Sequence, residues 1–219
     1  MSNRIIYELG GLNLNTADIV INSATGILDQ PELKERKSQD WNEAHGLIID
    51  RSAPRFKERN IALNFTFVAA NSTTMTTTIA SISNALRSSG LKMLKITLPD
   101  LTDKPLIYYV ALNGTIQYNR KYTGGAIVVN GTINLIEPEP QKKIYKATGK
   151  VTASLTTSST APINVYFDEA NIVFDVQGAS QTNSHTFTTN GDHYVVITGD
   201  IDNLTVNSVT NLTSVWTLL

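Results

Sequence analysis

Hydrophobic and polar residues alternate strictly over residues 61–67, which predicts a β-strand with one buried face. The polar positions between them carry Ala62, Asn64 and Thr66, as expected for a solvent-facing side. A charged segment, "RFKER" (55–59), leads directly into this strand. The apolar positions are Ile61, Leu63, Phe65 and Phe67.

The pattern changes period after residue 72 and predicts one α-helix over 73–88. Ser72, Thr73 or Thr74 is expected to cap its start. Gly90 is expected to adopt the left-handed conformation that ends the helix. We predict that the helix covers one face of a sheet with an apolar stripe of Met75, Ile79, Ile82 and Leu86.

Strand patterns follow the predicted helix. The first predicted strand covers residues 91–98, and residues 106–122 are predicted to form a hairpin that turns at Asn113-Gly114. The apolar phase is then kept from Ile127 to Leu135, which predicts one long strand with Gly131 as a bulge or a point of close approach. Pro138 and Pro140 end this strand because proline lacks the amide donor.

The Pro-rich segment "EPEPQKK" is the best candidate for a domain boundary. Beyond residue 146 the chain is rich in Thr, Ser and Asn, and short strand patterns recur between turn signals, which is typical of a small sandwich. We therefore expect a mainly β protein with one α-helix. Residues 1–142 would form a β-sandwich or open barrel with a packed helix, and 146–219 a small all-β, sandwich-like domain.

The amino-acid composition excludes several classes of function. The 219 residues include no cysteine, which excludes disulfides and thiol chemistry. Lys plus Arg (18) nearly balances Asp plus Glu (19), so the basic surface typical of nucleic-acid binding is not expected. No signal peptide and no apolar run of membrane-spanning length is visible. We expect a soluble protein that is made in a cytoplasm, with no nucleic-acid partner and no membrane insertion.

No residue cluster predicts catalysis or a cofactor. His185 and His193 could face each other across a hairpin turning at Asn190-Gly191, but two histidines make a poor metal site. Asp200 and Asp202 have a calcium-like spacing without the remaining ligands of an EF-hand, so a solvated turn is expected. We predict no enzymatic activity, no metal and no cofactor.

The order of elements over residues 1–140 resembles the N-terminal domain of siphophage distal tail proteins and of the related prophage tail components. The resemblance rests on a Gly after a polar loop, then an aromatic residue, an Arg and an alternating strand, followed by a helix, "YYVALNG" and a last strand closing on Pro. In this sequence these positions are Gly46, Phe56, Arg59 and Ile61–Leu63–Phe65. The segment from Gly191 to Trp216 departs from the family pattern.

The resemblance implies a structural protein of the virion tail, a homo-oligomer that forms a ring between tail tube and tip. Other tail proteins would be its partners, with a bacterial surface glycan or protein as a further partner in host attachment. The polar segment 29–46 and the charged start of the next strand would lie at the boundary between subunits, where opposite charges set register and choice of neighbour. The predicted interface residues are Trp41, Arg36, Lys37, Glu43, Arg55, Lys57 and Arg59.

Two other functions remain open from sequence. One is a surface adhesin, favoured by the Thr- and Asn-rich C-terminal half. The other is a carbohydrate-binding β-sandwich, which would need exposed aromatic side chains on one face. Its candidate residues are Tyr166, Tyr194 and Trp216.

Overall fold

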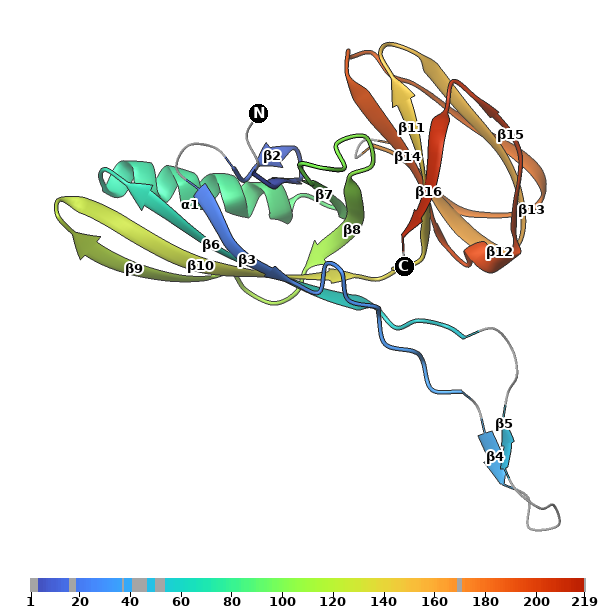
Figure 1. The fold of residues 1–219 in the computed structure, drawn as a ribbon, viewed down its shortest axis with the longest axis horizontal. Helices are drawn as coiled ribbons and strands as arrows, with labels where there is room; N and C mark the ends of the chain where they lie inside the picture. The colour runs from blue at the N-terminus through green and yellow to red at the C-terminus, as the bar shows by residue number, and fades with distance from the viewer. Residues whose placement is uncertain are drawn as a thin grey trace.

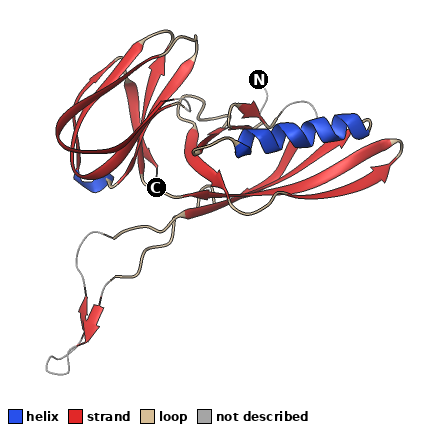
Figure 2. Cartoon of the chain, turned by 180° about the vertical axis from the view of Figure 1, so that it is seen from behind, coloured by secondary structure: helices blue, strands red, loops and turns tan. Residues whose placement is uncertain are grey.

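In the part of the chain that the structure describes, two large antiparallel β-sheets and one α-helix form, and a long arm with a separate two-stranded sheet projects from the first sheet (Figure 1). The computed structural model describes residues 4–15, 19–36, 38–40, 47–49, 54–168 and 171–218. The predicted class, mainly β with a single helix and a sandwich-like arrangement, is confirmed. Figure 2 shows that the helix lies on one side of the first sheet and that the second sheet lies beyond one end of the first sheet.

The first sheet has the strand order β2-β1-β7-β8-β10-β6-β3, and β9 pairs with β10. Its strands are β1 (Ile6–Leu9), β2 (Leu12–Asn13), β3 (Ile19–Thr25), β6 (Arg59–Ala69), β7 (Lys92–Thr97), β8 (Leu106–Leu112), β9 (Gln117–Thr123) and β10 (Ala126–Glu137).

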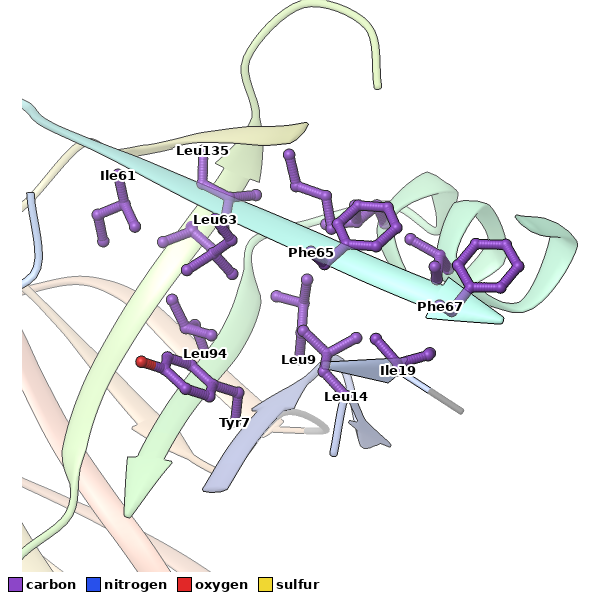
Figure 3. Packing of buried hydrophobic residues seen from close by; sticks show 14 of the residues in the cluster. Tyr7, Leu9, Leu14, Ile19, Ile61, Leu63, Phe65, Phe67, Leu94 and Leu135 are labelled. Atoms are coloured by element: carbon purple, nitrogen blue, oxygen red, sulfur yellow. The ribbon is translucent and has the colours of Figure 1, made fainter. Parts of the chain in front are cut away.

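β6 is the predicted alternating strand, and its odd-numbered residues are buried along its whole length. It pairs with β10 in unbroken register, from Ala69 opposite Ile127 to Arg59 opposite Glu137. The buried face of β6 meets the side chains of β1, β7 and the helix in one core, as Figure 3 shows for Tyr7, Leu9 and Leu94. This burial of apolar surface is the main stabilising contribution to the first sheet.

The helix α1 (Ser72–Arg87) lies where the period change predicts it. Its cap differs from the prediction: the side chain of Asn71, not Ser72, Thr73 or Thr74, accepts a hydrogen bond from the backbone N–H of Thr74 at 2.9 Å. Asn is as good a cap as Ser, since its side-chain oxygen also reaches the third amide of the helix. Three stripe residues are buried and Ile79 is partly buried against the core; the buried ones are Met75, Ile82 and Leu86.

The predicted hairpin over 106–122 is wrong. β8 and β9 do not pair with each other; both run antiparallel to β10, with Leu112 opposite Leu135 and Gln117 opposite Thr132. The turn at Asn113-Gly114 moves the chain along the same edge of β10 instead of reversing it. The hairpin in this region is β9–β10, which closes at Gly124-Gly125 with positive φ at both residues.

The second sheet has the order β13-β12-β14-β11-β16, and β15 pairs with β12. β12 pairs along one edge with β13, and its other edge is shared between β15 over residues 154–159 and β14 over 163–167. The strands are longer than the short ones predicted, because Pro162 and Gly178 lie at register shifts inside strands and do not end them. The strands are β11 (Lys142–Thr148), β12 (Thr152–Phe167), β13 (Asn171–Thr186), β14 (Asp192–Gly199), β15 (Leu204–Thr210) and β16 (Thr213–Leu218).

Among the residues that the structure describes, no helix is both long enough and apolar enough to cross a lipid bilayer.

Candidate functional site: the arm and the junction of the two sheets

The arm leaves the first sheet at a glycine turn. Gly26 follows β3 with φ +79°, and a β-carbon there would lie 1.9 Å from the carbonyl oxygen of Asn60, so only glycine fits. The two limbs of the arm then pair with each other. The N–H of Lys34 donates to the carbonyl oxygen of Arg55 at 2.7 Å, and that of Lys57 to Glu32 at 2.7 Å. The arm therefore starts as an extended two-stranded ribbon.

The distal part of the arm carries a short hairpin of β4 (Ser38–Asp40) and β5 (Leu47–Ile49). In the part of the chain that the structure describes, these two strands pair only with each other. Figure 1 shows them well away from both large sheets. A two-stranded hairpin without a core is marginally stable in water.

The predicted interface residues fall into three groups. Trp41, Lys37 and Glu43 lie outside the described residues. Arg36 is exposed on the arm. The last group, at the return limb of the arm, is Arg55, Lys57 and Arg59.

Arg55 connects the arm to the second sheet. Its Nη1 lies 2.5 Å from Asp200 Oδ1 and 3.7 Å from Asp202 Oδ2, at the 3-10 turn η1 (Ile201–Asn203). The hydrogen bond with Asp200 raises the pKa of Arg55. The two aspartates that have a calcium-like spacing in the sequence thus pair with an arginine of the same chain. Because the pair is partly exposed, salt screening weakens it.

Lys57 pairs across the ribbon, with Nζ 3.0 Å from Glu32 Oε2. This hydrogen bond raises the pKa of Lys57. Both side chains are exposed, and an exposed pair of this kind contributes little stability. Lys57 and Glu32 thus link the two limbs of the arm at its root.

Arg59 requires a correction, because it is not on the surface. It is 3% exposed, and its Nη1 donates to the carbonyl oxygen of Ile27 at 3.2 Å. Its guanidinium carbon lies 5.3 Å from the centre of the Tyr108 ring. Burial lowers the pKa of Arg59. Arg59 therefore does not lie on a surface that a neighbouring subunit could contact.

Arg59 belongs to a buried charged cluster that the sequence does not reveal. Its other members are Glu137, the last residue of β10, and Lys142, the first residue of β11. Arg59 Nε lies 3.6 Å from Glu137 Oε2, and Lys142 Nζ contacts Glu137 Oε1. In the sequence, the only indication of this cluster is that Glu137 and Lys142 flank the Pro-rich linker.

The linker and both sheets meet at a packed junction. Tyr109 of β8 donates its hydroxyl to the carbonyl oxygen of Asp168 at 2.7 Å, and its ring stacks on Tyr166 at 3.8 Å between centroids. Glu139 of the linker accepts two hydrogen bonds from Asn164 Nδ2, both 2.9 Å. The division into a domain of residues 1–142 and a domain of residues 146–219 stays a prediction. The strand β11, which begins at Lys142, pairs within the second sheet.

Of the aromatic residues considered for carbohydrate binding, Tyr166 and Tyr194 are buried at this junction and Trp216 is partly buried, which corrects that expectation. Tyr166 and Tyr194 are 1% and 4% exposed, and Trp216 packs against the same cluster. Burial raises the pKa of Tyr166 to about 12. These residues offer no exposed platform for a sugar ring.

The two histidines do not face each other as a pair. β14 pairs with β11 and β12, not with β13, so the predicted hairpin at Asn190-Gly191 is wrong. The ring of Phe187 contacts both His185 and His193. His193 Nδ1 lies 2.7 Å from Asp168 Oδ2. Among the described residues, no group of three or more His, Asp or Glu side chains could hold a metal ion.

One solved structure that this chain resembles is the crystal structure of SPP1 Dit (gp 19.1), a paradigm of the hub adsorption apparatus in phages that infect Gram-positive bacteria. The superposition covers 89% of this chain and 98% of that chain, with 11% sequence identity and a TM-score of 0.47. No family model and no curated protein matches the sequence.

Proposed function

We propose that this chain is a structural component of a phage or prophage tail tip, where copies form a ring between the tail tube and the tip. The observation that carries the proposal is the arm, a paired ribbon that ends in a hairpin apart from the rest of its own chain. An arm of this kind gives each subunit a contact that reaches its neighbour. A head-to-tail contact that closes on itself generates a ring.

The order of elements supports the same assignment. The alternating strand, the helix, the strand carrying "YYVALNG" and the long strand closing on Pro138 follow one another as in the distal tail family that the sequence resembles. In this chain they build one sheet with the helix packed on it.

The interface that we propose is the arm from Glu32 to Lys57. It includes the exposed Arg36 and Lys57 together with Trp41, Lys37 and Glu43, and Arg55 lies at its root. Both charge signs occur along it, and Trp is a residue type favoured as an interface anchor. Other tail proteins are the further partners, and a contribution to host attachment is part of the proposal.

Immunogold electron microscopy tests this function. Antibody raised against the purified chain is applied to particles produced by the genome that encodes it. We expect gold at the tail tip. Labelling of the cell envelope with unlabelled tails would contradict the proposal and support the adhesin alternative.

A further inference from the structure

The buried pair Glu137 and Lys142 brackets the linker between the two sheets. Lys142 is fully buried and Glu137 is 1% exposed. Lys142 Nζ donates to the carbonyl oxygen of Ile107 at 3.1 Å and contacts the Glu137 carboxylate. An amine and a carboxyl group are therefore held together without access to water.

The surroundings favour the uncharged amine. Lys142 is fully buried, and the guanidinium of Arg59 approaches the second oxygen, Oε2, of the carboxylate that Lys142 contacts. Burial lowers the pKa of Lys142 well below its usual range, and the charge of Arg59 lowers it further. A desolvated lysine with a lowered pKa is a nucleophile.

A buried ion pair also carries a cost, because both charges lose their hydration. Condensing the pair into an amide would remove both charges and leave a neutral group that can be hydrogen-bonded in place. The chemistry of this site thus has a driving force and the reacting groups in contact.

We propose that Lys142 and Glu137 are joined by an intramolecular isopeptide bond. A proton passes from the lysine ammonium to the carboxylate, which gives an amine beside a carboxylic acid. Lys142 Nζ then forms a bond to Glu137 Cδ, and the Cδ–Oε1 bond breaks. Oε1 leaves as water with the carboxyl proton and one proton from the amine. Nothing is oxidised or reduced, and no further reactant is needed.

The environment suits both the reaction and its product. Arg59 Nε, 3.6 Å from Glu137 Oε2, faces the oxygen on which negative charge develops during attack. Charged donors placed at such an oxygen stabilise the transition state. After condensation the amide N–H keeps the carbonyl oxygen of Ile107 as its acceptor, and Oε2 keeps Arg59 beside it. The bond would tie the end of β10 to the start of β11.

Intact mass spectrometry of the purified, folded chain tests this directly. We expect a mass lower than the sequence mass by one water molecule. Trypsin should fail to cut after Lys142 and release peptide 122–143, also one water lighter, with no backbone fragments separating Glu137 from Lys142. Loss of ammonia at Asn130-Gly131, in the same peptide, differs in mass and is distinguished by this measurement.

Two controls sharpen the test. Lys142→Met should have its full sequence mass, and the exposed pair Lys57–Glu32 should stay unlinked in the wild-type chain, since water reaches it. Arg59→Met should lower the linked fraction. A wild-type chain of full mass, cut by trypsin after Lys142, would show a buried ion pair only and overturn the proposal without the need for any variant.

Discussion

The ring of Phe65 occupies the place where a side chain at Gly131 would begin. Gly131 lies opposite Phe65 in the β6–β10 ladder, and a β-carbon at 131 would sit 2.3 Å from Phe65 Cζ. The register continues through Gly131 without a bulge, so the glycine marks a close approach inside a continuous strand.

Gly131→Ala should therefore destabilise the protein by about 1–3 kcal/mol, the usual cost of overpacking a core. The measurement is the midpoint of urea unfolding. Phe65→Leu with Gly131→Ala should lose less than the sum of the two single changes, because the smaller side chain frees the space. Unchanged stability of the single Gly131→Ala variant would contradict the packing described.

Leu86→Ala should cost about 2–5 kcal/mol, since it leaves a cavity beneath the helix. Leu86 is 7% exposed and packs in the core of the first sheet. Thermal and urea unfolding measure the loss. Asn84→Ala, on the exposed side of the same helix, is the matched control and should lose nothing. Equal stability of the two variants would mean that the stripe is not core.

High pH should destabilise the fold through two buried tyrosines. Burial raises the pKa of Tyr108 and of Tyr166 to about 12. In the unfolded chain each phenol ionises near pH 10, so between about pH 10 and 12 the folded state binds more protons and stability falls as pH rises.

Urea unfolding at pH values below and above 10 measures this slope. A Tyr108→Phe, Tyr166→Phe double variant should show a shallower decline over the same pH range. Tyr122→Phe, at an exposed position, should leave the decline unchanged. A double variant with the wild-type slope would rule out these two phenols as its source.

The sequence predicts those elements whose pattern of hydrophobic residues repeats within a short stretch of the chain. The alternation of β6, the stripe of α1 and the phase kept through Gly131 each follow from residues close in the chain, and the structure shows all three. The turn at Asn113-Gly114 misled because the dipeptide indicates a change of direction but not which strand the next segment joins. β8 and β9 both join β10, which follows them in the sequence.

The buried charges could not be found this way. Arg59 stands in a charged run and Lys142 in "PEPQKK", and both segments read as exposed. Their burial comes from contacts with Tyr108 and Ile107 of β8, a strand distant from both in the sequence. The sequence likewise leaves open whether Tyr166 and Tyr194 are exposed, since only the packed junction shows that they are covered.

Trp41→Ala should impair assembly while leaving the melting temperature of the monomer nearly unchanged, as expected for an anchor that packs against a neighbour. Sedimentation at high protein concentration, beside a thermal melt, makes the comparison. Leu101→Ala, an exposed apolar residue between β7 and β8, is the control and should assemble normally. A fall of several degrees in the melting temperature of Trp41→Ala would show that Trp41 packs within its own chain.

Removal of the arm tests the central claim most directly. Residues 33–56 can be replaced by a short Gly-Ser turn, because the backbones of Glu32 and Lys57 are already hydrogen-bonded at 2.7 Å. Sedimentation velocity and negative-stain electron microscopy would compare this variant with the full chain over rising concentration. We expect closed rings from the full chain, and monomers with a nearly unchanged melting temperature from the variant, because the Arg55–Asp200 pair that it loses is partly exposed. Rings formed equally well without the arm would contradict the account.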